Sequence, residues 1–198
     1  MKQILFYTSS LEKGGAQRVI VNLAHYLTEK GYEVGIVTTN SGREEYAISA
    51  KVTEEEVTSS RICNLIKRYS KLRKIWKDYR PDLIVSFIGK NNFMALTTAF
   101  GMRIPVITSV RGEPFEEYYN FILRALSKTL MGVSKGIILQ TPDARAYFPK
   151  WIQKKSIILE NPLNPDFIGD YYEGERENEI ITVGRLDQNK NQKLIIDS

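Results

Sequence analysis

Short apolar runs alternate with longer helical segments along most of this chain, and this alternation limits the folds it can adopt. Runs such as Gln3–Tyr7 and Glu33–Thr38 have the length of buried strands. Between them, the apolar residues of 16–30 recur three and four positions apart, as they do on one face of a helix. A repeated strand–helix–strand order is typical of a parallel sheet covered by helices. We therefore expect an α/β protein with a Rossmann-like, doubly wound, mostly parallel sheet.

The remaining elements are predicted from the same two periodicities and from the turn residues between them. The polar stretch 40–60 is expected to be a loop with one short strand near Tyr46–Ala50, and its acidic run Glu54–Glu56 is expected to be solvated. Further strands are expected at 82–87, 105–110, 136–140, 156–159 and 180–183, and helices at 61–79, 92–100, 114–130, 142–148 and from about Asn191.

The composition changes after residue 160. Asn161–Pro165 (NPLNP) is stiff and rich in turn residues, and 169–179 is polar and acidic, as linkers are. We predict a Rossmann-like domain over 1–163, a linker over 164–178 and the start of a second domain over 179–198. So short a last segment has too few residues to bury a core of its own.

The rare residue types exclude several function classes. The 198-residue chain has one Cys and one His, so Cys63 and His25 supply no internal disulfide, no metal cluster and no Ser/His catalytic pair. No stretch approaches the roughly 18 apolar residues that span a bilayer, and the N-terminus lacks a secretory signal. We expect a cytoplasmic protein.

The basic excess of the chain lies on one element. The formal net charge is +5, and residues 61–80 contain eight Lys/Arg against the single acid Asp78, unlike the spread basic face of a nucleic-acid-binding protein. Two interpretations of the helix at 61–79 stay open. In one, its cations attract an anionic membrane surface, on the inner face of the cell membrane. In the other, its apolar stripe packs on the sheet and leaves a solvated basic side. Both can hold at once, because packing and lipid would use different sides of the helix. The stripe comprises Ile62, Leu65, Ile66, Tyr69, Leu72, Trp76 and Tyr79.

Two glycine-containing turns follow predicted strands and precede helices. Gly14 and Gly15 come after the first strand, where backbone N–H groups at a helix start favour an anion such as phosphate; a tight turn without a ligand is the alternative. Gly184 follows the strand at 180–183, and Arg185 and Lys190 place two cations beside the next helix start, suited to a diphosphate. Two solvated surface cations are the alternative there.

Together these segments resemble retaining glycosyltransferases of the GT-B fold, specifically glycosyltransferase family 4. The similar segments are FYTSSLEKGGAQRVIVNLAHYL near the start, PDLIVSF in the middle, and NPLNPDF followed by ITVGRLDQNKN at the end. The resemblance implies two Rossmann-like domains, the first binding mostly the acceptor and the second mostly the nucleotide sugar. The sugar would be transferred in the cleft between them.

The resemblance also implies roles for individual residues. Gly14 and Gly15 would line the cleft near the donor phosphates, and Arg185 and Lys190 would neutralise the diphosphate leaving group, where charge builds as the bond to the sugar breaks. The donor would be a UDP- or GDP-linked hexose, transferred with retention and without a metal. The acceptor would be a glycan or lipid-linked glycan in bacterial surface polysaccharide synthesis.

Candidate acceptor contacts follow two strands in the middle of the chain. Lys90 and Asn91 open a helix after the strand at 82–87, with an ordinary capping turn as the alternative. Ser109, Arg111 and Glu113 lie where many family members have a histidine that contacts the sugar, and the sequence there is SVRGEP. Arg111 is expected to bind a substrate oxygen with Glu113 shaping it, or the two form a surface ion pair.

The sequence also differs from the family pattern in the residues that bind the donor. The pair of glutamates with which the family binds the nucleotide sugar is absent from these 198 residues. By the resemblance, the chain is therefore the N-terminal part of a transferase and is expected to be inactive by itself.

Two other function classes stay open. A non-catalytic, Rossmann-like module that binds phosphate or glycan is one, although a βα unit cut off after Lys193-Leu194-Ile195-Ile196 argues against it. A nicotinamide-dependent oxidoreductase is the other. The GGAQRV segment lacks the third glycine of a dinucleotide fingerprint, and no acid follows the second strand.

Overall fold

The computed structural model describes residues 2–12, 14–39, 53–56 and 63–161, and then 169, 173–175, 177–184 and 191–197. The chain divides into two compact units, Met1–Pro162 and Leu163–Ser198. The predicted linker and second-domain boundaries stay predictions.

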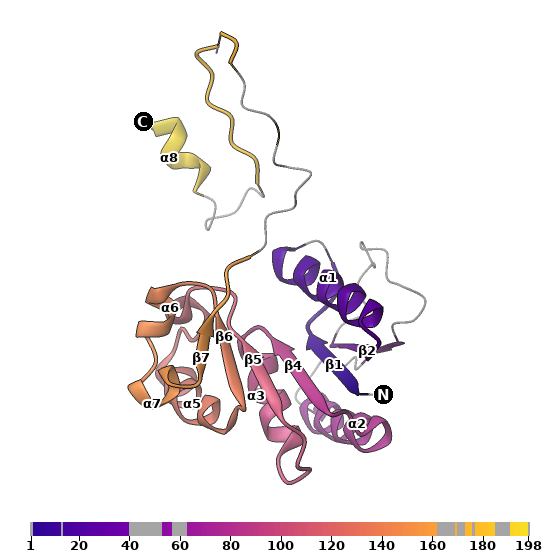
Figure 1. Ribbon diagram of the computed structural model, residues 1–198. Coiled ribbons are helices and arrows are strands. Elements are labelled where there is room, and N and C mark those ends of the chain that lie inside the picture. The colour runs from indigo at the N-terminus through magenta and orange to yellow at the C-terminus, as the bar shows by residue number, and fades with distance from the viewer. Residues whose placement is uncertain are drawn as a thin grey trace. The chain divides into compact units, whose positions relative to one another are not determined.

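One parallel sheet organises the first unit (Figure 1). Its seven strands run in the order β3-β2-β1-β4-β5-β6-β7, which confirms the predicted Rossmann-like α/β fold. Because the chain proceeds outward in opposite directions from β1 and β4, the topological switch point lies between these two strands. The strands are β1 Gln3–Thr8, β2 Glu33–Thr38, β3 Thr53–Glu56, β4 Leu83–Phe87, β5 Val106–Ser109, β6 Gly136–Leu139 and β7 Ser156–Ile158.

Helices cover both faces of the sheet and create two cores. Because successive strand residues point to opposite faces, Ile4 and Phe6 pack with α1, whereas Leu5 and Tyr7 pack with α2 and α3. The helices of the first unit are α1 Gly15–Glu29, α2 Cys63–Tyr79, α3 Gly89–Ala99, α4 Pro114–Glu117, α5 Phe121–Leu130, the 3₁₀ helix η1 Met131–Val133, α6 Pro142–Ala146 and α7 Lys150–Gln153.

Trp76 of α2 is a fully buried anchor of the second core. Its ring meets Tyr7 edge-on, with 6.1 Å between centroids, and its Nε1–H donates to Thr98 Oγ1 at 2.9 Å. Burying so large an aromatic side chain is favourable only when its N–H finds a partner. Trp76 therefore fixes how α2 lies against both the sheet and α3.

The apolar stripe predicted for α2 is wrong at its beginning. Leu72 and Trp76 are buried as predicted, but Leu65 and Ile66 are 57% and 74% exposed. Ile75, which the prediction left out, is buried. The first turns of α2 extend beyond the part of the sheet that the later turns cover.

The helix predicted over 114–130 is two helices. Asn120 interrupts it, because its side chain accepts the backbone N–H of Leu123 at 2.8 Å and caps the start of α5. Tyr118 lies between α4 and α5 and is 1% exposed. Turning this aromatic ring into the core ends α4 after a single turn.

The acidic run Glu54–Glu56 lies in strand β3 rather than in a loop. Its backbone pairs with β2, and β3 is the edge of the sheet. Charged residues suit an edge strand because they discourage pairing with another chain. The expected strand near Tyr46–Ala50 lies outside the described residues.

In the second unit, α8 (Gln192–Asp197) begins where a helix was expected. The strand predicted at 180–183 is absent, and Ile180, Ile181 and Val183 are at least 80% exposed. A strand forms only when a neighbour supplies backbone hydrogen bonds, and no strand of the second unit is described beside it. No described helix of the chain is long and apolar enough to cross a membrane.

The Trp76–Thr98 contact predicts a measurable coupling. Thr98→Val leaves the buried indole N–H without an acceptor and should lower the free energy of unfolding by about 1–3 kcal/mol. Trp76→Phe removes the donor, so the double variant should lose about 1 kcal/mol less than the sum of the single losses. Urea denaturation of the four proteins measures the cycle.

Thr97→Val is the matched control, because the Thr97 hydroxyl bonds only to carbonyls of its own helix at Phe93 and Met94. It should show no coupling to Trp76→Phe. Additive losses for Thr98→Val and Trp76→Phe would contradict the assigned hydrogen bond.

Candidate functional site

Polar side chains gather at the carboxyl edge of the sheet, where open α/β folds bind ligands. Asn92 and Ser109 are 0% exposed there, and Asn91 is 4% exposed. Three buried hydroxyl groups at the strand ends have no hydrogen-bond partner within the described residues: Thr8 Oγ1, Ser86 Oγ and Ser109 Oγ. Buried polar atoms without partners are rare, so this edge is the candidate site.

Arg68 reaches into the edge from α2. Its Nη2 donates to Tyr7 Oη at 2.7 Å, to Asn91 Oδ1 at 2.9 Å and to Thr39 Oγ1 at 3.1 Å. These acceptors follow or end β1, β4 and β2, so the guanidinium lies at the topological switch point. All three are neutral at neutral pH, and Arg68 Nε is buried without a partner. A cation whose partners among the described residues are all neutral is well placed to meet an anionic ligand.

Sequence analysis missed Arg68, treating it as one cation among many on a basic helix. A signal was present: Arg68, Leu72, Ile75 and Tyr79 are spaced by four, three and four positions, which places Arg68 on the packed face of α2. Arg73 also points inward, donating to the carbonyl oxygens of Thr98 and Phe100. The expectation of a fully solvated basic side is therefore wrong for both arginines.

Lys90 and Asn91, both predicted acceptor contacts, behave differently. Asn91 is buried, and its Nδ2 donates to Ser9 Oγ at 2.9 Å, so it connects the ends of β1 and β4. Lys90 is exposed, with its Nζ 5.9 Å from the centre of the Tyr119 ring. Lys90 thus lies on the accessible rim of the edge, whereas Asn91 holds Arg68 in place.

The turn between β4 and α3 is strained. Ile88 has φ +74°, a conformation that costs a β-branched residue on the order of 1–3 kcal/mol. Its backbone N–H donates to the Ser109 carbonyl, and its own carbonyl accepts from Asn91 and Asn92. The strain therefore persists because neighbouring backbone groups fix the turn.

The predicted group Ser109, Arg111 and Glu113 follows β5. Ser109 is buried, and its carbonyl accepts from Asn92 Nδ2 at 3.0 Å. The Arg111 guanidinium lies 5.6 Å from the centre of the Phe87 ring and donates to the Asn161 side chain, and burial lowers its pKa. Glu113 is exposed and makes no ion pair with Arg111 within the described residues. Arg111 therefore belongs to the edge, and the expected surface pair is not formed.

Glu117 is a second residue that sequence analysis missed. Its side chain lies between the β4–α3 turn and the loop after β5, and its carboxylate accepts the backbone N–H of Gly89. Burial raises the pKa of this carboxyl, while the backbone N–H groups of Gly89 and Gly112 partly oppose the rise. No sequence signal identifies it, because its partners are backbone amides, which almost every residue carries.

Gly14 precedes α1, as predicted, and its backbone is extended, with φ −177°, so no left-handed conformation demands a glycine. At Gly15 an added Cβ would meet no atom within 4 Å. Local packing thus leaves Gly15 unexplained. Arg185 and Lys190, the other predicted phosphate contacts, lie outside the described residues.

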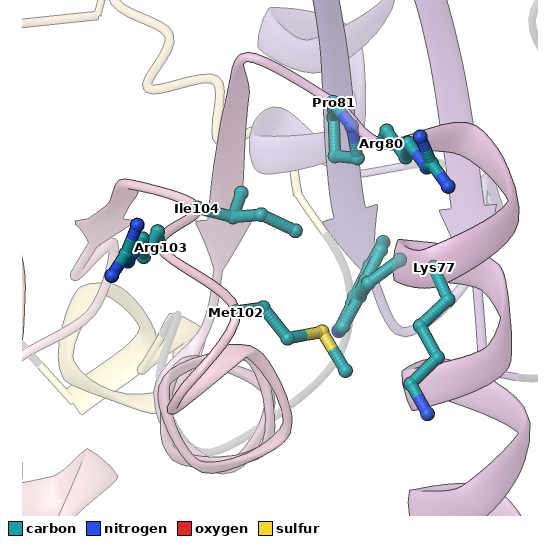
Figure 2. Close-up of a pocket in the computed structure, with 7 residues that line it drawn as sticks. Lys77, Arg80, Pro81, Met102, Arg103 and Ile104 are labelled. Atoms are coloured by element: carbon teal, nitrogen blue, oxygen red, sulfur yellow. The ribbon is translucent and has the colours of Figure 1, made fainter.

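A hollow of about 530 Å³ lies at the opposite, amino edge of the sheet (Figure 2). Met102 and Ile104 point into it, while the side chains of Arg80 and Arg103 diverge. Lys77 and Arg80 lie at the end of α2, where cations favourably meet the negative end of the helix dipole. These cations are explained without a ligand, and the hollow is distant from the predicted site residues.

Cationic and neutral polar side chains share this edge. Arg68, Lys90 and Arg111 lie at the same ends of the strands as the neutral hydroxyls and amides, a combination that recognises phosphate and sugar hydroxyl groups. No cluster of three His, Cys, Asp or Glu side chains that could hold a metal occurs in the described part of the chain.

Comparison with known proteins agrees with this geometry. The family model described as Glycosyltransferase Family 4 matches residues 13–167. A Campylobacter jejuni protein named as an alpha-1,4-N-acetyl-D-galactosaminyltransferase that acts on a diNAcBac-PP-undecaprenol glycan is 28% identical over 99% of this chain and 56% of its own length. The amylovoran biosynthesis glycosyltransferase AmsD of Erwinia amylovora is 22% identical over 99% of this chain and 57% of its own. The chain thus spans little more than half the length of these relatives.

Solved structures share the fold. Anabaena HepE in complex with UDP-glucose superposes with a TM-score of 0.63 at 16% identity, covering 84% of this chain and 45% of HepE. The lipopolysaccharide outer core galactosyltransferase WaaB gives 0.64 at 11% identity, covering 81% of this chain and 46% of WaaB. The fold resembles one half of each GT-B-type enzyme.

The buried carboxyl of Glu117 predicts a pH dependence of stability. Because its folded-state pKa is raised above the unfolded value, the folded state holds the proton more tightly. The contribution of Glu117 to stability is fully present at a pH below the pKa that it has in the unfolded chain. It is lost as the pH rises through the pKa that Glu117 has in the folded protein. Relative to Glu117→Gln, the wild type should therefore gain stability as the pH falls from neutral toward the ordinary glutamate pKa of about 4.3.

Urea unfolding across this range measures the difference. Glu116→Gln, one position away and exposed, should retain the wild-type pH profile. Parallel profiles for the wild type and Glu117→Gln would show that Glu117 titrates normally.

Proposed function

This chain belongs to glycosyltransferase family 4, and from that premise we propose that it transfers a hexosyl group from a nucleotide sugar to a glycan or lipid-linked acceptor. The setting would be bacterial surface polysaccharide synthesis, with retention at the anomeric carbon. The described domain would be the acceptor-binding half, and the reaction would need a donor-binding half that these 198 residues do not supply.

The proposal rests on the cationic side chains that lie at the carboxyl ends of the strands. Arg68, with its three neutral partners, would bind an anionic group of the acceptor at the switch point. Lys90 on the rim and Arg111 at the end of β5 would contact further oxygens. The name of the Campylobacter relative includes a diphosphate-linked polyprenol, and an acceptor of that class offers both the phosphate and the sugar hydroxyls that this edge suits.

The donor would be UDP- or GDP-linked. HepE was crystallised with UDP-glucose, and the open space at Gly15 would let donor phosphates approach the start of α1. Arg185 and Lys190 would neutralise charge on the leaving diphosphate without a metal ion. In this scheme the described edge positions the acceptor hydroxyl, and the catalytic charge stabilisation comes from the donor side.

An acceptor-binding experiment tests the proposal on the described domain. The probe is farnesyl diphosphate carrying an N-acetylgalactosamine disaccharide, measured by calorimetry, with free farnesyl diphosphate and the free disaccharide as separate arms. Transfer from UDP-linked and GDP-linked sugars is assayed with the 198-residue chain and with the complete product of its reading frame. Binding by the chain with transfer only by a longer product supports the proposal.

Absence of both binding and transfer would refute the acceptor assignment. Binding without transfer by a reading frame that stops after Ser198 would favour the non-catalytic module.

Replacing Arg68 should weaken acceptor binding. Arg68→Met keeps the length of the side chain but removes its charge, and the loss of a charge-assisted hydrogen bond of about 1.5–3 kcal/mol corresponds to roughly 10–100-fold weaker binding. Arg68→Lys should recover part of the affinity. Lys74→Met, an exposed change on the same helix, is the control and should bind like the wild type.

We also propose contact with an anionic membrane surface through 61–79. Ile66, Lys67 and Lys74 of α2 are exposed, and surface lysines each contribute about 1 kcal/mol near anionic lipid. Sedimentation with phosphatidylglycerol vesicles should show binding that falls with added salt. Equal binding to neutral vesicles would contradict the electrostatic attraction.

A further inference from the structure

We propose that Glu117 is a positioning residue for the acceptor, holding the β4–α3 turn and the loop after β5 at a fixed separation. The inference rests on the proposed function of this edge, but the arrangement it describes can be tested without any substrate. Lys90 follows the β4–α3 turn directly, and Arg111 belongs to the loop after β5. Glu117 lies between this turn and this loop.

The contact with the β4–α3 turn is close. The Glu117 carboxylate accepts the backbone N–H of Gly89, the first residue of α3. A Cβ atom at Gly89 would lie 2.9 Å from both Cγ and Oε1 of Glu117, so any larger residue would require the Glu117 side chain to shift. The three atoms nearest to that Cβ position all belong to Glu117, so glycine at position 89 is what permits this close approach.

The contact with the loop after β5 uses the other oxygen. Oε2 is buried and has no hydrogen-bond partner within the described residues, and a Cβ at Gly112 would lie 3.7 Å from it. The Gly112 backbone N–H is near enough to favour the charged form of Glu117. One carboxylate thus faces backbone amides of both loops.

The short helix α4 fixes the position of the Glu117 carboxylate. Its first residue, Pro114, is buried, and the backbone N–H of Glu117 donates to the Glu113 carbonyl at 2.9 Å. Tyr118, directly after the helix, is 1% exposed, and the centre of its ring lies 5.4 Å from that of Phe93 of α3. With both ends of α4 anchored, Glu117 has little freedom to leave the space between the loops.

The same residues explain how the strained turn is retained. Ile88, at φ +74°, is followed immediately by Gly89. Removing the Glu117 acceptor would leave the Gly89 N–H unsatisfied and let the turn relax in part, against the backbone hydrogen bonds of Ile88 that remain. Lys90 follows Gly89 directly, so relaxation would move a cation that we place in acceptor binding.

Hydrogen exchange of the free protein gives the first readout. Glu117→Ala should raise amide exchange about tenfold or more in both 87–92 and 109–113, whereas Glu116→Ala should leave both at the wild-type rate. Glu117→Gln keeps an acceptor for Gly89 but turns a donor toward Gly112, so it should loosen 109–113 and spare 87–92. Unchanged exchange in both segments for a folded Glu117→Ala protein would overturn the inference.

A double-variant cycle distinguishes positioning from a general loss of folding. Gly89→Ala should lower the melting temperature of the wild type because its Cβ displaces the Glu117 carboxylate. In the Glu117→Ala background that space is empty, so the added effect of Gly89→Ala should disappear. Equal shifts in both backgrounds would contradict the contact.

Acceptor binding supplies the functional readout. With the farnesyl diphosphate probe, Glu117→Ala should bind at least tenfold more weakly at a temperature where it is fully folded, and Glu117→Gln should recover part of that loss. Wild-type affinity in a folded Glu117→Ala protein would refute positioning. If the wild type fails to bind the probe, the acceptor assignment fails, while exchange and the Gly89 cycle still decide whether Glu117 holds the two loops.

Discussion

Helices pack on both faces of strands β1 and β4. This burial on two sides determines which residues of the first unit form its cores and where its polar residues can gather. Alternate residues of β1 supply each core, so a shift of one position would exchange their faces. Burial of both faces also removes the interior of the sheet as a place for ligands. Polar residues can then be concentrated only where strands end, and the carboxyl edge is where they lie.

The fold was largely predictable because apolar spacing reports local burial. Both long helices α1 and α2 and most strands follow from it, including the boundaries of β2. The failures have separate physical reasons. Apolar spacing continues through 114–130, yet one buried tyrosine and one capping asparagine divide that helix. Edge strand β3, with the sequence TEEE, has no apolar pattern to find, although its backbone pairs with β2.

The site was predictable in part, because strand ends can be located from the sequence. Lys90, Asn91, Ser109 and Arg111 all lie at the carboxyl edge, although only contacts in the folded chain distinguish buried Asn91 from accessible Lys90. Arg68 could have been found from its place on the packed face of α2. Glu117 could not, because its partners are amides of Gly89 and Gly112, and every residue except proline carries such a group.

Arg68 also gives helix α2 two surfaces with different tasks. One side of the helix presents lysines to the surroundings, while a single guanidinium on the other side is hydrogen-bonded to the ends of three strands. Trp76 anchors α2 against both the sheet and α3. The same helix that presents lysines to the surroundings therefore also holds Arg68 at the strand ends, so substitutions on its two sides act on different surfaces of the protein.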